Sequence, residues 1–118
     1  MTVFKMNTEN HLVRCFIYCR NGREATDLPS ASLSDQEKRL IEYAERNEIN
    51  IVGIFKETTN TNLNKRPIFF TMLQRIKRKE ANGILILNKK CIPTSINYYS
   101  KLLRLFEQNL IVEFISAE

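Results

Sequence analysis

Four consecutive apolar residues, Ile84-Leu85-Ile86-Leu87, directly follow the pair Asn82-Gly83. A strand in the interior of a parallel sheet is buried on both faces, so its sequence is a continuous apolar run of this kind. Further apolar runs lie at residues 12–18, 49–55 and 110–115. We therefore predict four strands, with residues 84–87 in the interior of a parallel sheet.

Helical segments separate these strands. Ser34-Asp35-Gln36-Glu37 is a capping box, in which the serine and glutamate side chains each bond the other's backbone amide, so we expect the first helix to begin at Ser34. Arg66-Pro67 is expected to begin the second helix, because the amide hydrogen that proline lacks would have no partner in the first turn. Asn82-Gly83 is expected to supply the left-handed residue that ends it.

A third helix is predicted where apolar residues recur at i, i+3, i+4 and i+7. These residues are Tyr99, Leu102, Leu103 and Phe106, and Asn109 is expected to end the helix. Strands that alternate with helices predict right-handed crossovers and a three-layer α/β/α fold, with a mainly parallel sheet of four or five strands. We assign residues 12–118 to one domain and residues 1–11 to a flexible N-terminal tail.

Composition excludes several classes of protein. A length of 118 residues, with 43% hydrophobic and 26% charged residues, is typical of one soluble domain. No apolar run approaches the roughly 20 residues that span a bilayer, so we expect no membrane segment. The odd number of three cysteines favours a reducing compartment, and we expect a cytoplasmic protein. Because His11 is the only histidine, a His-rich metal site is excluded, and we expect neither a metal nor a cofactor. The net charge of +5 permits an acidic partner such as nucleic acid.

In open parallel sheets, functional sites form beyond the carboxyl ends of the strands. The loops expected there are residues 19–33, 56–65 and 88–94. A phosphate-binding loop needs several glycines after the first strand, but only Gly22 lies there, so no nucleotide cofactor is expected. A cysteine phosphatase is excluded as well, because the residues six positions after Cys19 and Cys91 are Ala25 and Asn97 rather than arginine.

The three cysteines are interpreted as small thiols without a chemical role. Cys15 and Cys19 lie four residues apart in one predicted strand, about 13 Å, which is too far for a disulfide. Cys19 and Cys91 end two predicted strands, and a redox pair between them is the alternative.

Two basic runs stand out. Arg75-Ile76-Lys77-Arg78-Lys79 lies at the end of the second predicted helix and is interpreted as a solvated face that complements the helix dipole, with phosphate contact as the alternative. Lys89-Lys90 lies in one of the loops that face the expected site, so a functional role is favoured more there.

Three motifs follow one another along the chain. They are Ile17-Tyr18-Cys19-Arg20-Asn21-Gly22, then Ser32-Leu33-Ser34-Asp35-Gln36, then Glu57 with Arg66-Pro67 and Met72-Leu73. In this order and spacing they resemble the Y-x-R-x-S, S-L-x-x-Q and E…R-P…L motifs of the serine recombinases of the resolvase and invertase type. Residues 81–87, 99–106 and 112–118 resemble the segments that follow, so the resemblance covers residues 12–118 as a resolvase-like catalytic-type domain.

The resemblance implies a role in DNA recombination or integration. In that family a serine hydroxyl attacks a backbone phosphate of DNA and forms a phosphoserine link, while arginines neutralise the charge on the phosphoryl oxygens. It implies that Arg20 and Arg66 are such arginines and that Gln36 supports the site. As partners it implies a homo- or hetero-oligomer with a recombinase and the backbone phosphates of DNA, contacted by Arg20, Arg23, Arg66, Lys89 and Lys90.

Several site positions depart from the family pattern. Gly22 stands where the family has its nucleophilic serine. The family's D-R-L-S-R loop falls on residues 90–94, so Lys90 replaces the aspartate, and Cys91 and Thr94 replace the two arginines. Loss of even one preorganised charge typically lowers the rate by about 10²–10³. We therefore expect a pseudoenzyme, a recombinase-like domain that is unable to form the phosphoserine link.

Three alternatives remain. In the first, the chain is an active but divergent recombinase that uses Ser30 or Ser32 as nucleophile together with Arg20, Arg23 and Arg66. In the second it is a non-catalytic protein-interaction module, and in the third an unrelated α/β domain that binds a small ligand at the strand ends. The recombinase fold should place Arg20, Gln36 and Arg66 around one hollow.

Overall fold

The computed structural model describes residues 2–5, 13–22, 32–59, 66–93, 96–111 and 113–118. These residues form five strands, three α-helices and one short 3-10 helix, η1. In chain order the elements are β1 (Thr2–Lys5), β2 (Arg14–Gly22), α1 (Leu33–Arg46), β3 (Asn50–Thr59), α2 (Pro67–Lys77), β4 (Gly83–Ile86), η1 (Lys89–Cys91), α3 (Ile96–Glu107) and β5 (Glu113–Ser116).

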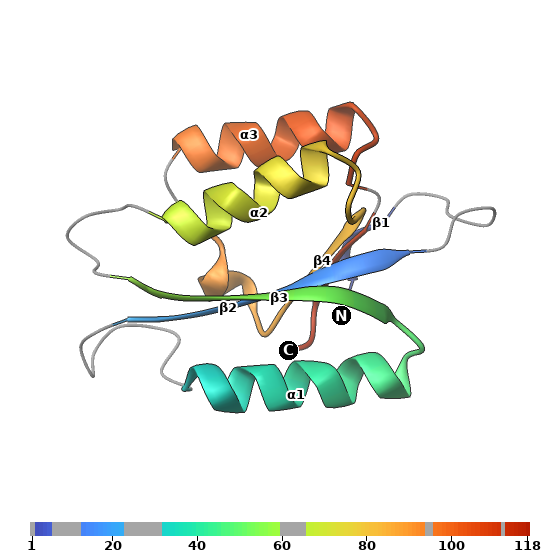
Figure 1. The fold of residues 1–118 in the computed structure, drawn as a ribbon, viewed down its shortest axis with the longest axis vertical. Coiled ribbons are helices and arrows are strands. Elements are labelled where there is room, and N and C mark those ends of the chain that lie inside the picture. The colour runs from blue at the N-terminus through green and yellow to red at the C-terminus, as the bar shows by residue number, and fades with distance from the viewer. Residues whose placement is uncertain (1, 6–12, 23–31, 60–65, 94–95, 112) are drawn as a thin grey trace.

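The strands form a single sheet in the order β1-β5-β4-β2-β3. β2 pairs in parallel with β3 and β4, β4 pairs in parallel with β5, and β1 pairs antiparallel with β5. Figure 1 shows α1 on one face of this sheet and α2 and α3 together on the other. The predicted three-layer α/β/α class with a mainly parallel sheet is confirmed, and the apolar strand β4 lies in the interior of the sheet.

The side chains of β2 supply both hydrophobic cores, because successive residues of a strand point to opposite faces. Phe16 and Tyr18 face α2 and α3, whereas Cys15, Ile17 and Cys19 face α1. The core under α2 and α3 also takes buried side chains from Phe69, Met72, Ile76, Ile84, Ile86 and Leu102. The core under α1 takes Leu40, Ala44, Leu85 and Ile115. Both layers of helices are thus anchored on one central strand.

β2 and β3 continue past the ends that their apolar residues predict. β2 runs to Gly22 and β3 to Thr59, and their parallel register places Arg20 opposite Glu57 and Gly22 opposite Thr59. The pairing of β4 with β2 reaches only Ile17, so the last part of β2 and β3 is a two-stranded extension. This extension carries polar residues to the site. The hydrogen bonds between β2 and β3 hold these residues in strands, although they show no apolar pattern.

The capping box predicted at Ser34 is wrong. α1 begins at Leu33, and its N-cap is Ser32, whose Oγ accepts a hydrogen bond from the Asp35 amide at 3.1 Å. The capping serine therefore lies two residues earlier than predicted. The amide that it caps is still three residues after it. The earlier start gives Leu33 a place against the core under α1, which the local pattern of polar residues does not encode.

α2 begins at Pro67 as predicted, but Asn82-Gly83 does not end it. The left-handed residue after this helix is Lys79, with φ of 67°. Asn82 instead extends the sheet, because its amide donates to the Arg14 carbonyl oxygen at 2.9 Å and its Oδ1 accepts from the Arg14 amide at 2.7 Å. The left-handed residue after α3 is Asn109, as predicted.

The N-terminal segment contributes a strand that the sequence does not predict. Within the expected flexible tail, Thr2–Lys5 forms β1, with Thr2 opposite Ile115 and Lys5 opposite Glu113. This correction has a physical reason, since β5 would otherwise present a row of unpaired backbone groups at the edge of the sheet. Residues 6–11 of that tail lie outside the described residues.

Gly83 is required by the close approach of β4 to β2. A Cβ at this position would lie 2.6 Å from Cys15 Sγ and 3.3 Å from the Glu113 carbonyl oxygen. Because these atoms are packed in a filled core, we expect Gly83→Ala to lower the free energy of unfolding by about 1–3 kcal/mol in urea denaturation. Cys15→Ala removes the nearest atom, so the double variant should lose less than the sum of the single variants. Strictly additive losses would contradict this contact.

Candidate functional site

Gln36 connects α1 to the extended end of β2. It is fully buried, its Nε2 donates to the Arg20 carbonyl oxygen at 2.8 Å, and its Oε1 accepts from the Arg20 amide at 3.1 Å. Because β4 pairs with β2 only as far as Ile17, the Gln36 amide satisfies backbone groups that the sheet ladder does not reach. Gln36 therefore fixes the strand end that carries the predicted site arginine.

The side chain of Arg20 is directed towards β3 and is almost buried, with 6% of the residue exposed. Its Nε donates to Thr59 Oγ1 at 2.7 Å. A buried guanidinium is tolerated only when it is hydrogen-bonded. The arrangement holds a positive charge inside the two-stranded extension, beside Gly22, which pairs with Thr59 across the same two strands.

Glu57 supplies a buried carboxylate to the start of α2. Its Oε1 accepts from the Tyr18 hydroxyl at 2.6 Å and from the Phe69 amide at 3.1 Å, and its Oε2 accepts from the Ile68 amide at 2.8 Å. A carboxylate is favoured there because the first amides of a helix have no partner within it. Burial, followed by the hydrogen bond to Glu57, raises the pKa of Tyr18 far above its ordinary value.

Arg66 precedes α2 and joins it to η1 and α3. Its Nη1 donates to the Cys91 carbonyl oxygen at 2.8 Å and approaches the Tyr18 hydroxyl at 3.5 Å. Its backbone amide donates to the Tyr98 hydroxyl at 3.0 Å. The second predicted site arginine is thus half-buried and held by groups from three other elements.

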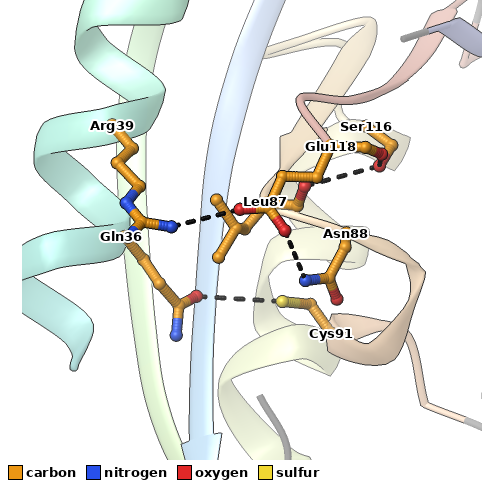
Figure 2. Close-up of polar contacts among 7 residues, drawn as sticks. All are labelled: Gln36, Arg39, Leu87, Asn88, Cys91, Ser116 and Glu118. Carbon is orange, nitrogen blue, oxygen red and sulfur yellow. Dashed lines mark hydrogen bonds and ion pairs between the residues drawn. The ribbon is translucent and has the colours of Figure 1, made fainter. Parts of the chain in front are cut away.

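Cys91 brings the predicted residues together. Its thiol donates to Gln36 Oε1 at 3.7 Å, as Figure 2 shows. Its carbonyl oxygen accepts a hydrogen bond from the Arg66 guanidinium. Arg20 is close enough for its charge to lower the pKa of Cys91, although burial outweighs this and leaves that pKa raised. Gln36 and Arg66 therefore both bond to Cys91, and Arg20 lies near it, so the three predicted residues are gathered around Cys91.

This combination of fold and clustered residues agrees with comparisons to known proteins. The sequence matches the family described as "Resolvase, N terminal domain" over residues 15–118. The chain belongs to the resolvase N-terminal domain family. A comparison with curated protein sequences gave no match.

Solved structures of serine recombinases share the fold of this resolvase domain. The N-terminal catalytic domain of TP901-1 integrase is 21% identical with a TM-score of 0.68, over 88% of this chain and 76% of that one. The C-terminal catalytic domain of ISC1926 TnpA, an IS607-like serine recombinase, is 17% identical with a TM-score of 0.67, over 89% and 70%. A resolvase family site-specific recombinase from Streptococcus pneumoniae is 17% identical with a TM-score of 0.65, over 89% and 72%.

Several positions of the sequence were compared with the family's catalytic serine, aspartate and arginines. In this resolvase domain these positions do not share one environment. Gly22 is the last residue of β2 and is half-buried. Lys89 and Lys90 are exposed in η1, where the Lys90 amide donates to Asn88 Oδ1 at 3.0 Å. Ser32 is the N-cap of α1. Three further predicted positions, Arg23, Ser30 and Thr94, lie outside the described residues.

Ser116 and Glu118 make further contacts beside η1 that the sequence does not predict. The Glu118 amide donates to the Leu87 carbonyl oxygen at 2.8 Å, and Glu118 Oε1 accepts from Asn88 Nδ2 at 3.3 Å. Glu118 Oε2 pairs with Arg39 of α1 at 3.1 Å, and the Ser116 hydroxyl donates to the Glu118 carbonyl oxygen at 2.9 Å (Figure 2). No local signal indicates these contacts, because most of the partners are 30 or more residues apart.

The structure describes neither a metal centre nor a membrane span. No group of three or more His, Cys, Asp or Glu residues is placed to hold a metal ion within the described ranges. Within those same ranges no helix combines the length and apolar character that crossing a membrane requires.

The Glu57 carboxylate offers a direct test of the site's construction. Glu57→Gln keeps the shape but leaves Tyr18 and two helix amides to share one carbonyl oxygen, so we expect it to lower the free energy of unfolding by about 1–3 kcal/mol. Tyr18→Phe removes a single hydrogen bond and should cost about 1 kcal/mol. The exposed Glu42→Gln is the matched control, expected within about 0.5 kcal/mol of the parent. If urea denaturation gives Glu57→Gln and Glu42→Gln the same free energy of unfolding, the capping role of Glu57 is contradicted.

The three thiols should be unreactive in the folded chain. They are buried and free, and burial is the main cause that raises the pKa of Cys15 and of Cys19 to about 12 and also raises that of Cys91. A rise from 9.0 to about 12 lowers the thiolate fraction near pH 8 roughly a thousandfold. We expect almost no reaction with Ellman's reagent at pH 8 and three equivalents in guanidinium. Ser100→Cys, on the exposed surface of α3, should react at once; fast native reaction of Cys19 or Cys91 would favour the redox pair.

Proposed function

We propose that this resolvase domain does not form the phosphoserine link and acts as a non-catalytic recombinase domain that contacts DNA and pairs with an active recombinase. The observation that carries the proposal is Gly22. It ends β2 beside Arg20, at the position that the sequence matches to the nucleophile, and it has no side chain to attack a phosphate. Without that oxygen, position 22 cannot form the bond to phosphorus that would replace the bond between phosphorus and the sugar oxygen.

The surroundings of Cys91 support the same proposal. At this position the family pattern has an arginine that would neutralise charge on a phosphoryl oxygen. The thiol of Cys91 is uncharged, because burial raises its pKa, and it is directed inwards to Gln36. Arg66, which is retained, donates to the Cys91 carbonyl oxygen. Gln36 holds the backbone of Arg20, and Arg66 holds the Cys91 carbonyl oxygen, and this favours a structural role for the retained residues.

The exposed cations at the strand ends support a remaining contact with DNA. Lys89 and Lys90 are exposed in η1 at the carboxyl end of β4, where ligands of parallel sheets bind. Phosphate contacts of this type position a protein on DNA without chemistry. Arg20 is buried, so in this proposal it orders the strand end and the two lysines meet the phosphates.

The proposal is tested by searching for the covalent product. The full chain is incubated with a supercoiled plasmid library that carries genomic DNA, digested with nuclease, and analysed by mass spectrometry for a nucleotide attached to serine. We expect no adduct with the parent chain. Gly22→Ser alone should remain at least 10⁴-fold below a variant that combines Gly22→Ser, Lys90→Asp, Cys91→Arg and Thr94→Arg, because two charge-neutralising arginines are still absent.

Two outcomes would contradict the proposal. An adduct on the parent chain at Ser30 or Ser32 would favour the divergent active recombinase, and Ser30→Ala and Ser32→Ala would identify which serine reacts. Absence of the adduct in the fourfold variant, when circular dichroism shows that this variant is folded like the parent, would contradict the matching of these positions to the family's site.

A further inference from the structure

A groove between α2 and α3 has an apolar floor and a cationic rim. The buried side chains of Leu73 and Leu105 form the floor, and the rim is formed by the exposed residues Lys77, Lys101 and Arg104. The hollow has a volume of about 230 Å³. Lys77 is the last residue of α2, about 15 Å along the helix axis from the first residue, which lies at the strand-end site. The groove is therefore a surface separate from that site.

An exposed aromatic ring extends this floor towards the start of α2. Phe70 is 38% exposed and lies three residues before Leu73, so the two side chains are neighbours on one face of the helix. Lys101 Nζ of α3 lies 5.5 Å from the centroid of the Phe70 ring, which places this ring beside the rim. The residues of α2 that border the groove, from Phe70 to Lys77, therefore extend over about two helical turns.

The charges around the groove have one sign. Its other lining residues are Gln74 and Gln108, whose side-chain amides can donate hydrogen bonds, and none of the described residues that line it has a carboxylate. Residues 66–80 and 96–108 contain seven lysines and arginines against two glutamates. On the opposite face of the sheet (Figure 1), α1 contains four acidic against three basic residues. The groove therefore favours a partner that brings anionic groups.

The basic run at residues 75–79 divides its roles in the structure. Arg75 pairs with Glu80 at 2.8 Å and lies over the rings of Phe16 and Phe55, at 5.3 and 5.4 Å from their centroids. Lys77 lines the groove instead. The solvated helix end that the sequence predicts is therefore only part of the arrangement, because α3 adds two further cations beside Lys77.

We propose that the α2–α3 groove binds an amphipathic α-helix of a partner protein, with acidic residues on both sides of its apolar stripe. A helix that lies in a groove inserts apolar side chains at positions i, i+3 or i+4, and i+7, which also span about two turns. The cations of the rim come from both helices, so carboxylates on the two sides of the stripe pair with Lys77 of α2 and with Lys101 and Arg104 of α3. The volume of about 230 Å³ is below the roughly 300–1,000 Å³ of sites for drug-sized ligands, which favours a few inserted side chains over a whole organic molecule.

The apolar floor favours a protein partner over a polyanion. A chain of phosphates pairs with the cations but has no apolar group to cover Phe70, and burial of apolar surface is the main favourable contribution to most protein association. Aromatic residues that a partner can bury are also among those that contribute most to the free energy of protein–protein binding. This proposal goes beyond the strand-end chemistry and does not depend on whether strand transfer occurs.

Binding of a designed peptide to the full chain tests the proposal. The probe is a fluorescein-labelled helical peptide with leucine at positions i, i+3, i+4 and i+7, glutamate at the flanking positions and alanine elsewhere. Fluorescence anisotropy at about 0.15 M salt, where exposed charges are screened beyond about 8 Å, should show saturable binding. Replacement of the leucines by alanine, or Phe70→Ala in the chain, should weaken binding at least about tenfold, because each removes apolar surface that the complex buries.

An exchange of charge tests whether the peptide lies in the groove. Lys101→Glu with Arg104→Glu should weaken binding of the acidic peptide at least about tenfold, whereas a peptide with lysine in place of glutamate should bind this variant more tightly than the parent. The matched control is Lys38→Glu with Arg46→Glu on α1, which changes the net charge equally and should bind both peptides as the parent does. A gain in affinity for the lysine peptide requires a folded groove, so unfolding of the variant cannot produce it.

Three outcomes would overturn the proposal. They are no binding of the acidic peptide by the parent, displacement of that peptide by an equal charge of polyglutamate or duplex DNA, and equal losses of affinity in the two double variants. Displacement of this kind would show that the groove recognises negative charge alone, and equal losses would show an effect of net charge. The peptide assay uses no DNA substrate and the covalent-adduct assay uses no peptide, so failure of this proposal and failure of the proposed function are distinguishable.

Discussion

The carboxylate of Glu57 is the interaction on which the arrangement of this resolvase domain depends. It lies buried near the end of β3. It accepts hydrogen bonds from the Tyr18 hydroxyl of β2 and from the first free amides of α2. A buried carboxylate is stable only when its oxygens accept hydrogen bonds. These hydrogen bonds therefore hold β2, β3 and α2 in one relative position. Tyr18 also approaches Arg66, which reaches η1 through the Cys91 carbonyl oxygen. The elements that form the strand-end site are therefore positioned by one connected network.

The same network would let a recombinase site lose its chemical groups and keep its shape, as the proposed function requires. Gln36 forms two hydrogen bonds with the backbone of Arg20, and these order the end of β2 without a bound substrate. Cys91 occupies the interior with a neutral thiol and still offers a carbonyl oxygen to Arg66. Folding in this region depends on backbone groups and a few buried polar side chains. Gly22 contributes no side chain to that network, so the network does not depend on a side chain at this position.

The distribution of charge separates two surfaces of the molecule. The strand-end site buries Arg20, leaves Arg66 half-buried, and exposes Lys89 and Lys90. The α2–α3 face gathers cations around a small groove, and α1 on the opposite side is nearly neutral. The helices on the two faces of the sheet therefore differ in charge.

The sequence by itself determined the order of the three α-helices and of the strands β2 to β5, because apolar periodicity, Pro67 and Asn109 are local signals whose meaning does not depend on distant residues. It also determined the family resemblance and the position of Gly22 within it. Tertiary structure decided where β2 and β3 end, since their polar last residues are held by a ladder between segments nearly 40 residues apart. It also decided that Ser32 caps α1, that Thr2–Lys5 completes the sheet, and that Cys91 lies between Gln36 and Arg66. These features depend on burial and on hydrogen bonds between residues far apart in the chain, and a local pattern contains no record of which distant groups will meet.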